Sequence, residues 1–172
     1  MLAAELLALG RDNDSRRALL HSIPMSLEHF DSPEAAILSG FPPGAVRIVA
    51  SRANGDDAYV LLDTRPDGPP YLYGVEVRRE PDGWIEGGSS NTSGWRLTEP
   101  EAELGSLVEW DEAPIGADRV RVALGADVHE EPIENGAFLT AWWRVPSPDT
   151  LSPRTVAFRI DGRWIDSRAL AV

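Results

Sequence analysis

The sequence contains no cysteine, no lysine and no glutamine among its 172 residues. Without cysteine, the chain has no disulfide, no thiolate metal ligand and no cysteine nucleophile. Without lysine, it has no Schiff-base lysine, no phosphate-loop lysine and no lysine general base. The 16 basic residues are therefore all arginine, which is typical of proteins from GC-rich bacterial genomes. These absences exclude several classes of enzyme.

Positive charge is also scarce, because 28 acidic residues face 16 basic ones and give a net charge of −12. Nucleic acids and anionic membranes bind proteins through positive charge, so we expect neither as a partner. The apolar share of 42 % is ordinary for a globular protein of one large or two small domains. The apolar stretch Met1–Gly10 is short, contains Glu5 and lacks a basic start. We therefore expect no signal peptide and a cytoplasmic protein.

Motifs that carry chemistry are missing as well. The chain has no Gly-x-Ser-x-Gly elbow and no Gly-x-Gly-x-x-Gly turn after a strand. The three histidines, at positions 21, 29 and 129, do not have the spacing of a metal site. We predict no catalytic residue, no metal and no cofactor.

The hydrophobic pattern predicts helices first and strands afterwards. Leucines in the first 23 residues recur near a helical period, and Ser32-Pro33-Glu34 has the cap, proline and acid that begin a helix. From residue 45 onward, alternating apolar residues predict strands near 46–51, 58–63, 71–77, 84–86, 107–110, 119–124, 128–133, 137–145, 154–160 and 163–166. The polar stretch 87–94 is predicted to be a loop, and 99–104 one or two helical turns.

Four turn dipeptides separate these strands: Asn54-Gly55, Asp82-Gly83, Asn135-Gly136 and Asp161-Gly162. Such pairs favour two-residue hairpins, because glycine and asparagine adopt positive φ angles easily. We therefore predict an α+β fold, mainly antiparallel β. In residues 1–97, we expect N-terminal helices that lie on a curved antiparallel sheet. A connector follows in residues 98–105, and a β-sandwich-like half in residues 106–172.

The first half resembles NTF2-like and cystatin-like α+β domains in its order of elements. The resemblance is carried by helices followed by Asp57–Leu62, Tyr71–Val77 and Asp82-Gly83-Trp84. The resemblance implies a pocket between helix and sheet. The polar residues implied to line that pocket are His29, Tyr59, Asp63, Tyr71 and Tyr73. One alternative function is accordingly a small-molecule enzyme or carrier. The second half resembles a small β-sandwich without the cysteines of immunoglobulin domains.

An acidic segment and an aromatic strand favour a different function. The segment from residue 99 to residue 112 contains six acidic residues and no basic residue among them. The six are Glu99, Glu101, Glu103, Glu109, Asp111 and Glu112. Trp142 and Trp143 are adjacent in a strand and must point to opposite faces. We predict one face with Leu139, Ala141, Trp143 and Val145, and another with Phe138, Thr140, Trp142 and Arg144.

Aromatic residues and arginine concentrate binding energy at interfaces, and acidic groups attract basic partners. The sequence therefore predicts a non-enzymatic protein that binds another macromolecule, and an immunity-type or a regulatory role fits such a protein. The expected partner is a protein, and the acidic residues favour a basic one. The candidate partner-binding residues are Phe138, Trp142, Arg144, Glu109, Asp111 and Glu112.

Overall fold

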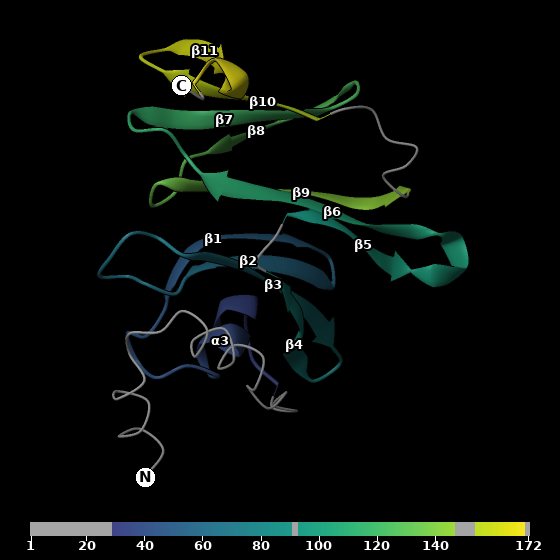
Figure 1. The fold of residues 1–172 in the computed structure, drawn as a ribbon. Coiled ribbons are helices and arrows are strands. Elements are labelled where there is room, and N and C mark those ends of the chain that lie inside the picture. Colours follow the sequence, from purple (N-terminus) through teal and green to yellow (C-terminus); the bar gives the residue numbers. More distant parts are fainter. Residues whose placement is uncertain (1–28, 91–92, 147–153, 171–172) are drawn as a thin grey trace.

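A computed structural model of the protein describes residues 29–90, 93–146 and 154–170. In this part of the chain, eleven strands form three antiparallel sheets that are stacked as layers, with one short α-helix outside them (Figure 1). The antiparallel β part of the predicted fold class is confirmed. The described residues hold a single α-helix of six residues, so the predicted α+β mixture is not supported there.

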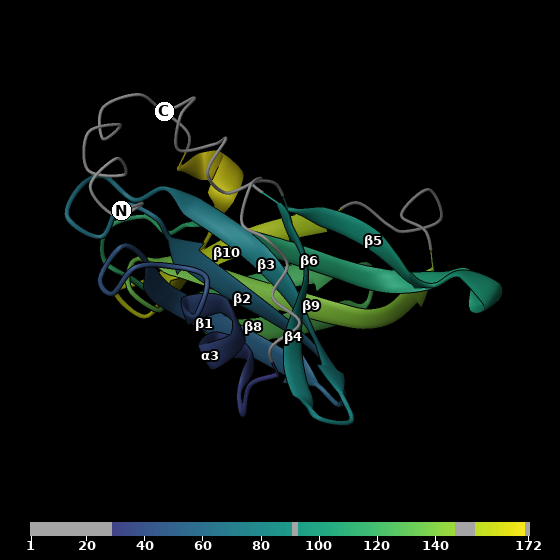
Figure 2. The same cartoon turned by 90° about the horizontal axis from the view of Figure 1, so that it is seen from below.

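Sheet A is a meander of four strands in the order β1-β2-β3-β4. Its strands are β1 (Arg47–Asn54), β2 (Asp57–Asp63), β3 (Leu72–Glu80) and β4 (Gly83–Ser90). The short helix α3 (Pro33–Leu38) packs on the outer face of sheet A, against β2, β3 and β4 (Figure 2). No helix among the described residues is long and apolar enough to cross a membrane.

Helix α3 begins where the sequence predicts a helix start. The hydroxyl of Ser32 accepts a hydrogen bond from the backbone N–H of Ala35 at 3.1 Å, and Pro33 occupies the first turn. The helix buries Ala36 and Ile37 against sheet A. The helices predicted farther upstream, before residue 29, lie outside the described residues.

The remaining strands form two more sheets. Sheet B has the order β5-β6-β9, and its strands are β5 (Gly94–Glu99), β6 (Leu104–Glu112) and β9 (Ala137–Pro146). Sheet C has the order β11-β10-β7-β8, and its strands are β7 (Ala117–Leu124), β8 (Asp127–Pro132), β10 (Arg154–Ile160) and β11 (Arg163–Asp166). Two 3-10 helices, η1 (Pro100–Ala102) and η3 (Ser167–Ala169), complete the described elements.

Sheet B is the middle layer and is packed on both faces (Figure 1). One core lies between α3 and sheet A, a second between sheets A and B, and a third between sheets B and C. The second core joins residues before position 97, such as Leu61, to residues after 106, such as Leu139. Residues of the two predicted halves therefore share one hydrophobic core.

Two of the predicted turns have the geometry that their sequences favour. Asn135 and Gly136 have φ angles of 50° and 81°, and Asp161 and Gly162 have 50° and 75°. Positive φ at both central positions matches the right-handed twist of the adjoining strands. The second turn joins β10 to β11, which have the predicted bounds.

The loop predicted for 87–94 is wrong for residues 87–90, whereas the helical turn predicted for 99–104 is present in shortened form. Residues 87–90, predicted to be part of a loop, continue strand β4 and pair with β3. Backbone pairing needs no apolar side chain, and a bulge beside Gly87 accommodates the irregular stretch. The helical turn predicted for 99–104 shrinks to η1, which lies inside the hairpin between β5 and β6, so 98–105 links two paired strands of one sheet.

Strand β9 follows the predicted alternation only as far as Trp143. Leu139, Ala141 and Trp143 pack toward sheet A, and Phe138 and Trp142 toward sheet C. At Arg144, φ becomes 57° and the pairing with β6 shifts between Gly105 and Leu107. This bulge carries Val145 to the sheet C side, contrary to the prediction, because an extra residue reverses the alternation.

Candidate functional site

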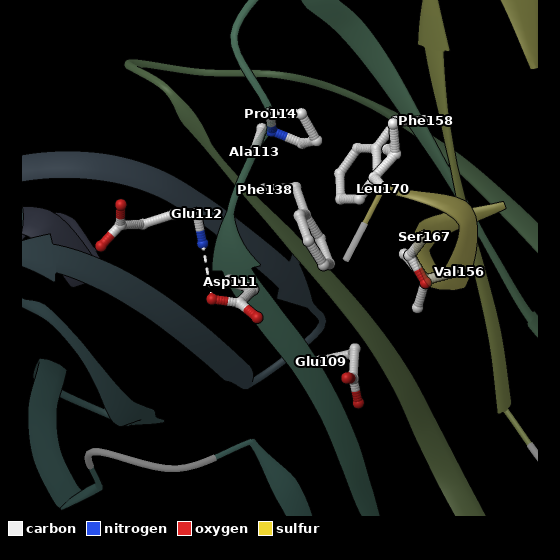
Figure 3. Close-up of a pocket in the computed structure, with 10 residues that line it drawn as sticks. All are labelled: Glu109, Asp111, Glu112, Ala113, Pro114, Phe138, Val156, Phe158, Ser167 and Leu170. Carbon is white, nitrogen blue, oxygen red and sulfur yellow. Dashed lines mark hydrogen bonds between the residues drawn. The ribbon is translucent and has the colours of Figure 1, made fainter. Parts of the chain in front are cut away.

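A cavity of about 400 Å³ lies between sheets B and C, at one end of their interface (Figure 3). Six lining residues are apolar, namely Ala113, Pro114, Phe138, Val156, Phe158 and Leu170. The four polar lining residues are Glu109, Asp111, Glu112 and Ser167. We call this cavity the acidic pocket. It brings the three predicted acidic residues together with Phe138.

Large aromatic side chains separate the two sheets around the pocket. Phe138 from β9 and Phe158 from β10 meet edge to face, with ring centroids 5.8 Å apart and an interplanar angle of 68°. Farther along the same interface, Trp142 stacks on His129 of β8, with centroids 4.7 Å apart. The interface is filled around Trp142, whose side chain is only 3 % exposed. At the other end of the interface, Phe138 and Phe158 border the pocket.

The acidic residues of the pocket come from one strand, β6. Side chains on a strand alternate between faces, so Glu109 and Asp111 point to the sheet C side, on which Phe138 also lies. Glu112 has the opposite parity, and its carboxylate points away from the aromatic side chains (Figure 3). Two of the three acidic residues therefore face the cavity with their carboxylates.

Glu109 is the most enclosed of these carboxylates, with a side chain 18 % exposed. Its carboxylate forms an ion pair with the guanidinium of Arg154 on β10. Burial raises the pKa of Glu109, the charge of Arg154 opposes that rise, and the nearby Asp111 adds to it. Asp111 itself accepts a hydrogen bond from the N–H of Glu112 at 2.8 Å.

The wall opposite β6 is formed by η3, which carries Ser167 and ends at Leu170. Asp166 caps this turn by accepting the backbone N–H of Arg168 at 2.9 Å. Hydrogen bonds from the side chain and backbone of Arg168 lower the pKa of Asp166 to about 2. The hydrogen bond from Arg168 thus caps the start of the turn that forms this wall.

The predicted partner-binding residues do not form one surface. Phe138 is 1 % exposed and forms part of the pocket floor, and Trp142 is buried beneath His129. Arg144 lies at the β9 bulge, with its side chain exposed, and its Nε pairs with Glu99 at 2.8 Å. Sheet C covers the aromatic face that was predicted to meet a partner.

The residues implied by the NTF2-like resemblance are divided between two faces of sheet A. Tyr59 faces sheet B, where its ring lies 6.2 Å from that of Trp143, and burial raises the pKa of its hydroxyl. Tyr73 faces α3, and its hydroxyl donates to the hydroxyl of Ser89 at 2.9 Å. The two hydroxyls therefore do not line a common space.

The other three residues of that set have local structural contacts. Asp63 is fully buried, pairs with Arg47 at 2.8 Å and accepts the backbone N–H groups of Arg65 and Tyr71. It thus fixes the turn between β2 and β3. The ring of Tyr71 lies under the guanidinium of Arg65, 4.8 Å from its centroid. His29 lies at the far end of sheet A, 3.6 Å from Glu80 on β3.

Sequence reasoning missed the lining residues Phe158 and Leu170, and it missed Arg154, which pairs with Glu109. It also missed Ile115, which follows Pro114 at the turn between β6 and β7 and is fully exposed. An isoleucine between proline and glycine in a turn is an unusual local choice and was an available signal. Nothing in the sequence places β10 and η3 beside β6, because these contacts span about 45 residues or more.

Within the described residues, no three histidine, aspartate or glutamate side chains lie close enough to hold a metal ion. The pocket offers instead carboxylates beside an aromatic floor, an arrangement suited to binding a cation with an apolar body. Comparison of the chain with protein-family models, with curated proteins and with solved structures gives no match.

Proposed function

We propose that this protein is a non-enzymatic binding protein that recognises a basic macromolecule, most directly a basic protein, at the acidic pocket. The observation that carries the proposal is the juxtaposition of Glu109 and Asp111 with the half-buried apolar lining residues Pro114, Val156 and Leu170. An interface needs an apolar centre for affinity and charges at the rim for orientation and rate. The pocket and its rim supply both.

Charge supports a basic partner. Arg154 balances Glu109, but Asp111 and Glu112 have no cationic partner among the described residues. The net charge of −12 adds a long-range field that attracts positively charged molecules. Ile115 adds an exposed apolar side chain beside Pro114, which lines the pocket. A partner with basic and apolar residues close together fits this surface.

The two alternatives raised by the sequence differ in support. The residues of the NTF2-like pocket lie on different faces of sheet A, so their positions favour no shared substrate site. Binding at the acidic pocket relies on residues that share one cavity. A regulatory or immunity-type role is compatible with this binding, and the identity of the partner distinguishes the two.

The test uses fluorescent ten-residue peptides of alternating arginine and leucine, and of alternating glutamate and leucine, titrated with the full chain. We expect the arginine peptide alone to bind, with an affinity that falls as salt rises, because rim charges are screened. The triple variant Glu109→Gln, Asp111→Asn, Glu112→Gln should weaken binding by roughly tenfold or more.

A matched control removes the same charge elsewhere. Three exposed acidic residues lie outside the pocket lining, namely Glu101, Asp67 and Asp161. Replacing them with Gln or Asn removes as many negative charges as the triple variant in the pocket does. This triple control should bind nearly as tightly as the parent. Equal weakening by both triple variants would contradict the proposed site, and no binding of the arginine peptide would contradict the proposed function.

A further inference from the structure

We propose that the outer face of sheet C carries a phosphate-binding site, in which the guanidinium of Arg119 is the central group and those of Arg121 and Arg159 assist it. The ligand is a phosphate group, either free or on a phosphorylated side chain. Sheet C is the outermost layer on the side away from sheet A (Figure 1). The site therefore lies on the opposite face of sheet C from the acidic pocket and is independent of the proposed function.

Strand pairing places three arginines next to one another on this face. Val120 of β7 points into the core between sheets B and C, so its neighbours Arg119 and Arg121 point outward. Arg159 of β10 is the direct cross-strand partner of Arg119. Like charges directly opposite each other on neighbouring strands are destabilising. Three guanidiniums in neighbouring positions therefore need anions close by.

Two of the three guanidiniums have a carboxylate of their own. Arg121 donates to Glu130, its cross-strand partner on β8, at 2.9 and 2.5 Å. Arg159 donates to the two oxygens of Asp118 at 2.8 and 2.5 Å. Each pair uses Nε and one terminal nitrogen, whereas a guanidinium carries five N–H donors. These two arginines are therefore held in place and keep donors for a further acceptor.

Arg119 differs, because the position across from it offers no side-chain acceptor. Its cross-strand partner on β8 is Pro132, whereas the partner of Arg121 is Glu130. Arg119 forms no ion pair with the described residues, and its Nε is buried without a hydrogen-bond partner. A donor that is shielded from water and lacks an acceptor is unfavourable. An anion bound at this guanidinium removes that cost.

The other carboxylates of this face are engaged elsewhere. The hydrogen bond from Arg159 is the largest cause of the lowered pKa of Asp118, and the charge of Arg119 is the smallest. Asp166 on β11 accepts hydrogen bonds from the guanidinium of Arg168 at 3.1 and 2.9 Å. The three guanidiniums thus share two carboxylates. One positive charge is left over on a chain whose net charge is −12.

The three arginines are open to solvent on this face. The side chains of Arg121 and Arg159 are 39 % and 34 % exposed, and Arg119 is half-buried. The ring centroid of Trp164 on β11 lies 4.1 Å from the guanidinium carbon of Arg121 and helps to hold it. This contact crosses β10, where the partner of Arg121 is the small Ala157. A ligand therefore meets guanidiniums that are already oriented.

The number of donors favours phosphate over a carboxylate. A carboxylate has two oxygens and matches one guanidinium side by side, as Asp118 matches Arg159. A phosphate group presents three strong acceptor oxygens and close to two negative charges, so it accepts from several guanidiniums at once. Arginine is the residue that recognises phosphate in this way, because its planar guanidinium donates through two parallel bonds.

The experiment titrates the isotope-labelled full chain with three ligands at constant ionic strength and follows backbone amide resonances. The ligands are inorganic phosphate, the Nα-acetyl methylamide of phosphoserine, and acetate. We expect phosphate to shift the resonances of Arg119, Arg121 and Arg159, with an affinity about threefold or more above that of acetate. Binding of the phosphoserine derivative at least as tight as that of phosphate indicates a phosphorylated side chain as the source, and weaker binding indicates free phosphate.

Two variants of the site and one control test the geometry. Arg119→Gln removes the guanidinium that lacks an acceptor and should weaken phosphate binding by roughly tenfold. Pro132→Glu puts a carboxylate opposite Arg119, as Glu130 lies opposite Arg121, and should weaken phosphate binding by roughly the same factor. Arg163→Gln removes an exposed positive charge at the start of β11 and should change the affinity by less than about twofold. Thermal unfolding checks that each variant is folded.

Several outcomes would overturn the phosphate site. Equal weakening by Arg119→Gln and Arg163→Gln would show that only the net charge matters. Equal binding of phosphate and acetate, or resonance shifts confined to other parts of the molecule, would also contradict it. Full phosphate binding by a folded Pro132→Glu variant would contradict the role of Arg119. None of these results bears on the acidic pocket, which the peptide titration tests separately.

Discussion

The two faces of sheet B are packed differently, although the same strand, β9, contributes to both. Toward sheet A it presents Ala137, Leu139 and Ala141, which are small or medium-sized and fully packed, followed by the half-buried Trp143. Toward sheet C it presents Phe138 and Trp142, whose large rings are almost fully buried. Small residues allow two sheets to approach closely, whereas bulky rings hold them apart and leave space where a ring ends. The acidic pocket lies at such a place.

We call the sheet A side of sheet B the closed face and the sheet C side the open face. The comparison teaches that the acidic pocket forms on the face where β9 presents Phe138, and that Pro114, after β6, and Ser167, in η3, complete its lining. Substitutions that change size on either face therefore test the comparison directly.

The largest effect is expected from Leu139→Ala on the closed face. Leu139 is completely buried, so its truncation leaves a cavity and should lower the free energy of unfolding by about 2–5 kcal/mol. Urea denaturation measures this loss. Val156→Ala, at the border of the pocket, should cost clearly less. Equal losses for the two variants, after allowance for side-chain size, would show that the two faces are equally well packed.

Enlarging a side chain should have opposite consequences on the two faces. Ala141→Leu adds volume to the closed face and should destabilise the protein by about 1–3 kcal/mol. Ser167→Leu adds volume at the wall of the pocket and should change stability by less than about 0.5 kcal/mol. Thermal unfolding compares the pair. A large loss for Ser167→Leu would mean that the pocket space is needed by the fold.

A smaller effect is expected at the far end of the open face, where His129 covers Trp142. Removing the imidazole in His129→Ala should cost about 1 kcal/mol and should make Trp142 accessible to acrylamide quenching. Because the chain has six tryptophans, the control carries Trp142→Phe as well. In the Trp142→Phe variant, His129→Ala should leave the acrylamide quenching unchanged. An equal increase in quenching in that variant would contradict the conclusion that His129 covers Trp142.

The smallest effect concerns pH. Burial raises the pKa of Glu109, so the folded state binds a proton at this residue more readily than the unfolded state does. Ionised Glu109 thus lowers stability at neutral pH, and this cost disappears as the pH falls through its folded-state pKa. Glu109→Gln should therefore be at least as stable as the parent at pH 7, with the difference vanishing on acidification.

Cation binding gives the opposite pH dependence and completes that prediction. A guanidinium favours the ionised form of Glu109, so the affinity for the peptide of alternating arginine and leucine should fall as the pH drops, beginning above the range of an ordinary glutamate. Arg154 and Asp111 are the charged groups that face Glu109. Titration of binding between pH 4 and 8 tests this, and an affinity independent of pH would exclude Glu109 from the site.

Much of the local structure was predictable, because it depends on short-range rules. The Ser32 cap, the turn at Asp161-Gly162 and strands β10 and β11 follow from cap chemistry, positive φ angles and alternation. The bulge at Arg144 was not predictable, since it depends on how β9 pairs with β6, some forty residues earlier. The sequence analysis did not predict strand β5, because this strand is recognised by its backbone pairing with β6 and not by alternating apolar side chains.

The candidate site was predictable only in part, for the same reason. Acidic residues at 109, 111 and 112 mark β6 as unusual, and alternation separates Glu112 from the other two. The sequence alone does not show that sheet C covers Trp142 and that the pocket opens at Phe138. Whether an end of the interface is filled or open depends on the strand of sheet C that lies there: His129 of β8 covers Trp142, and Phe158 of β10 meets Phe138.

By itself, the sequence determined the antiparallel strands, their turns and the alternation of β9 as far as Trp143, because periodicity and turn chemistry act over a few residues. Only the tertiary structure decided that sheet B lies between two others and that Glu109 and Asp111 meet Phe158 and Leu170. These contacts join strands that are distant in the chain, and the packing of whole sheets selects among the pairings that the local pattern permits.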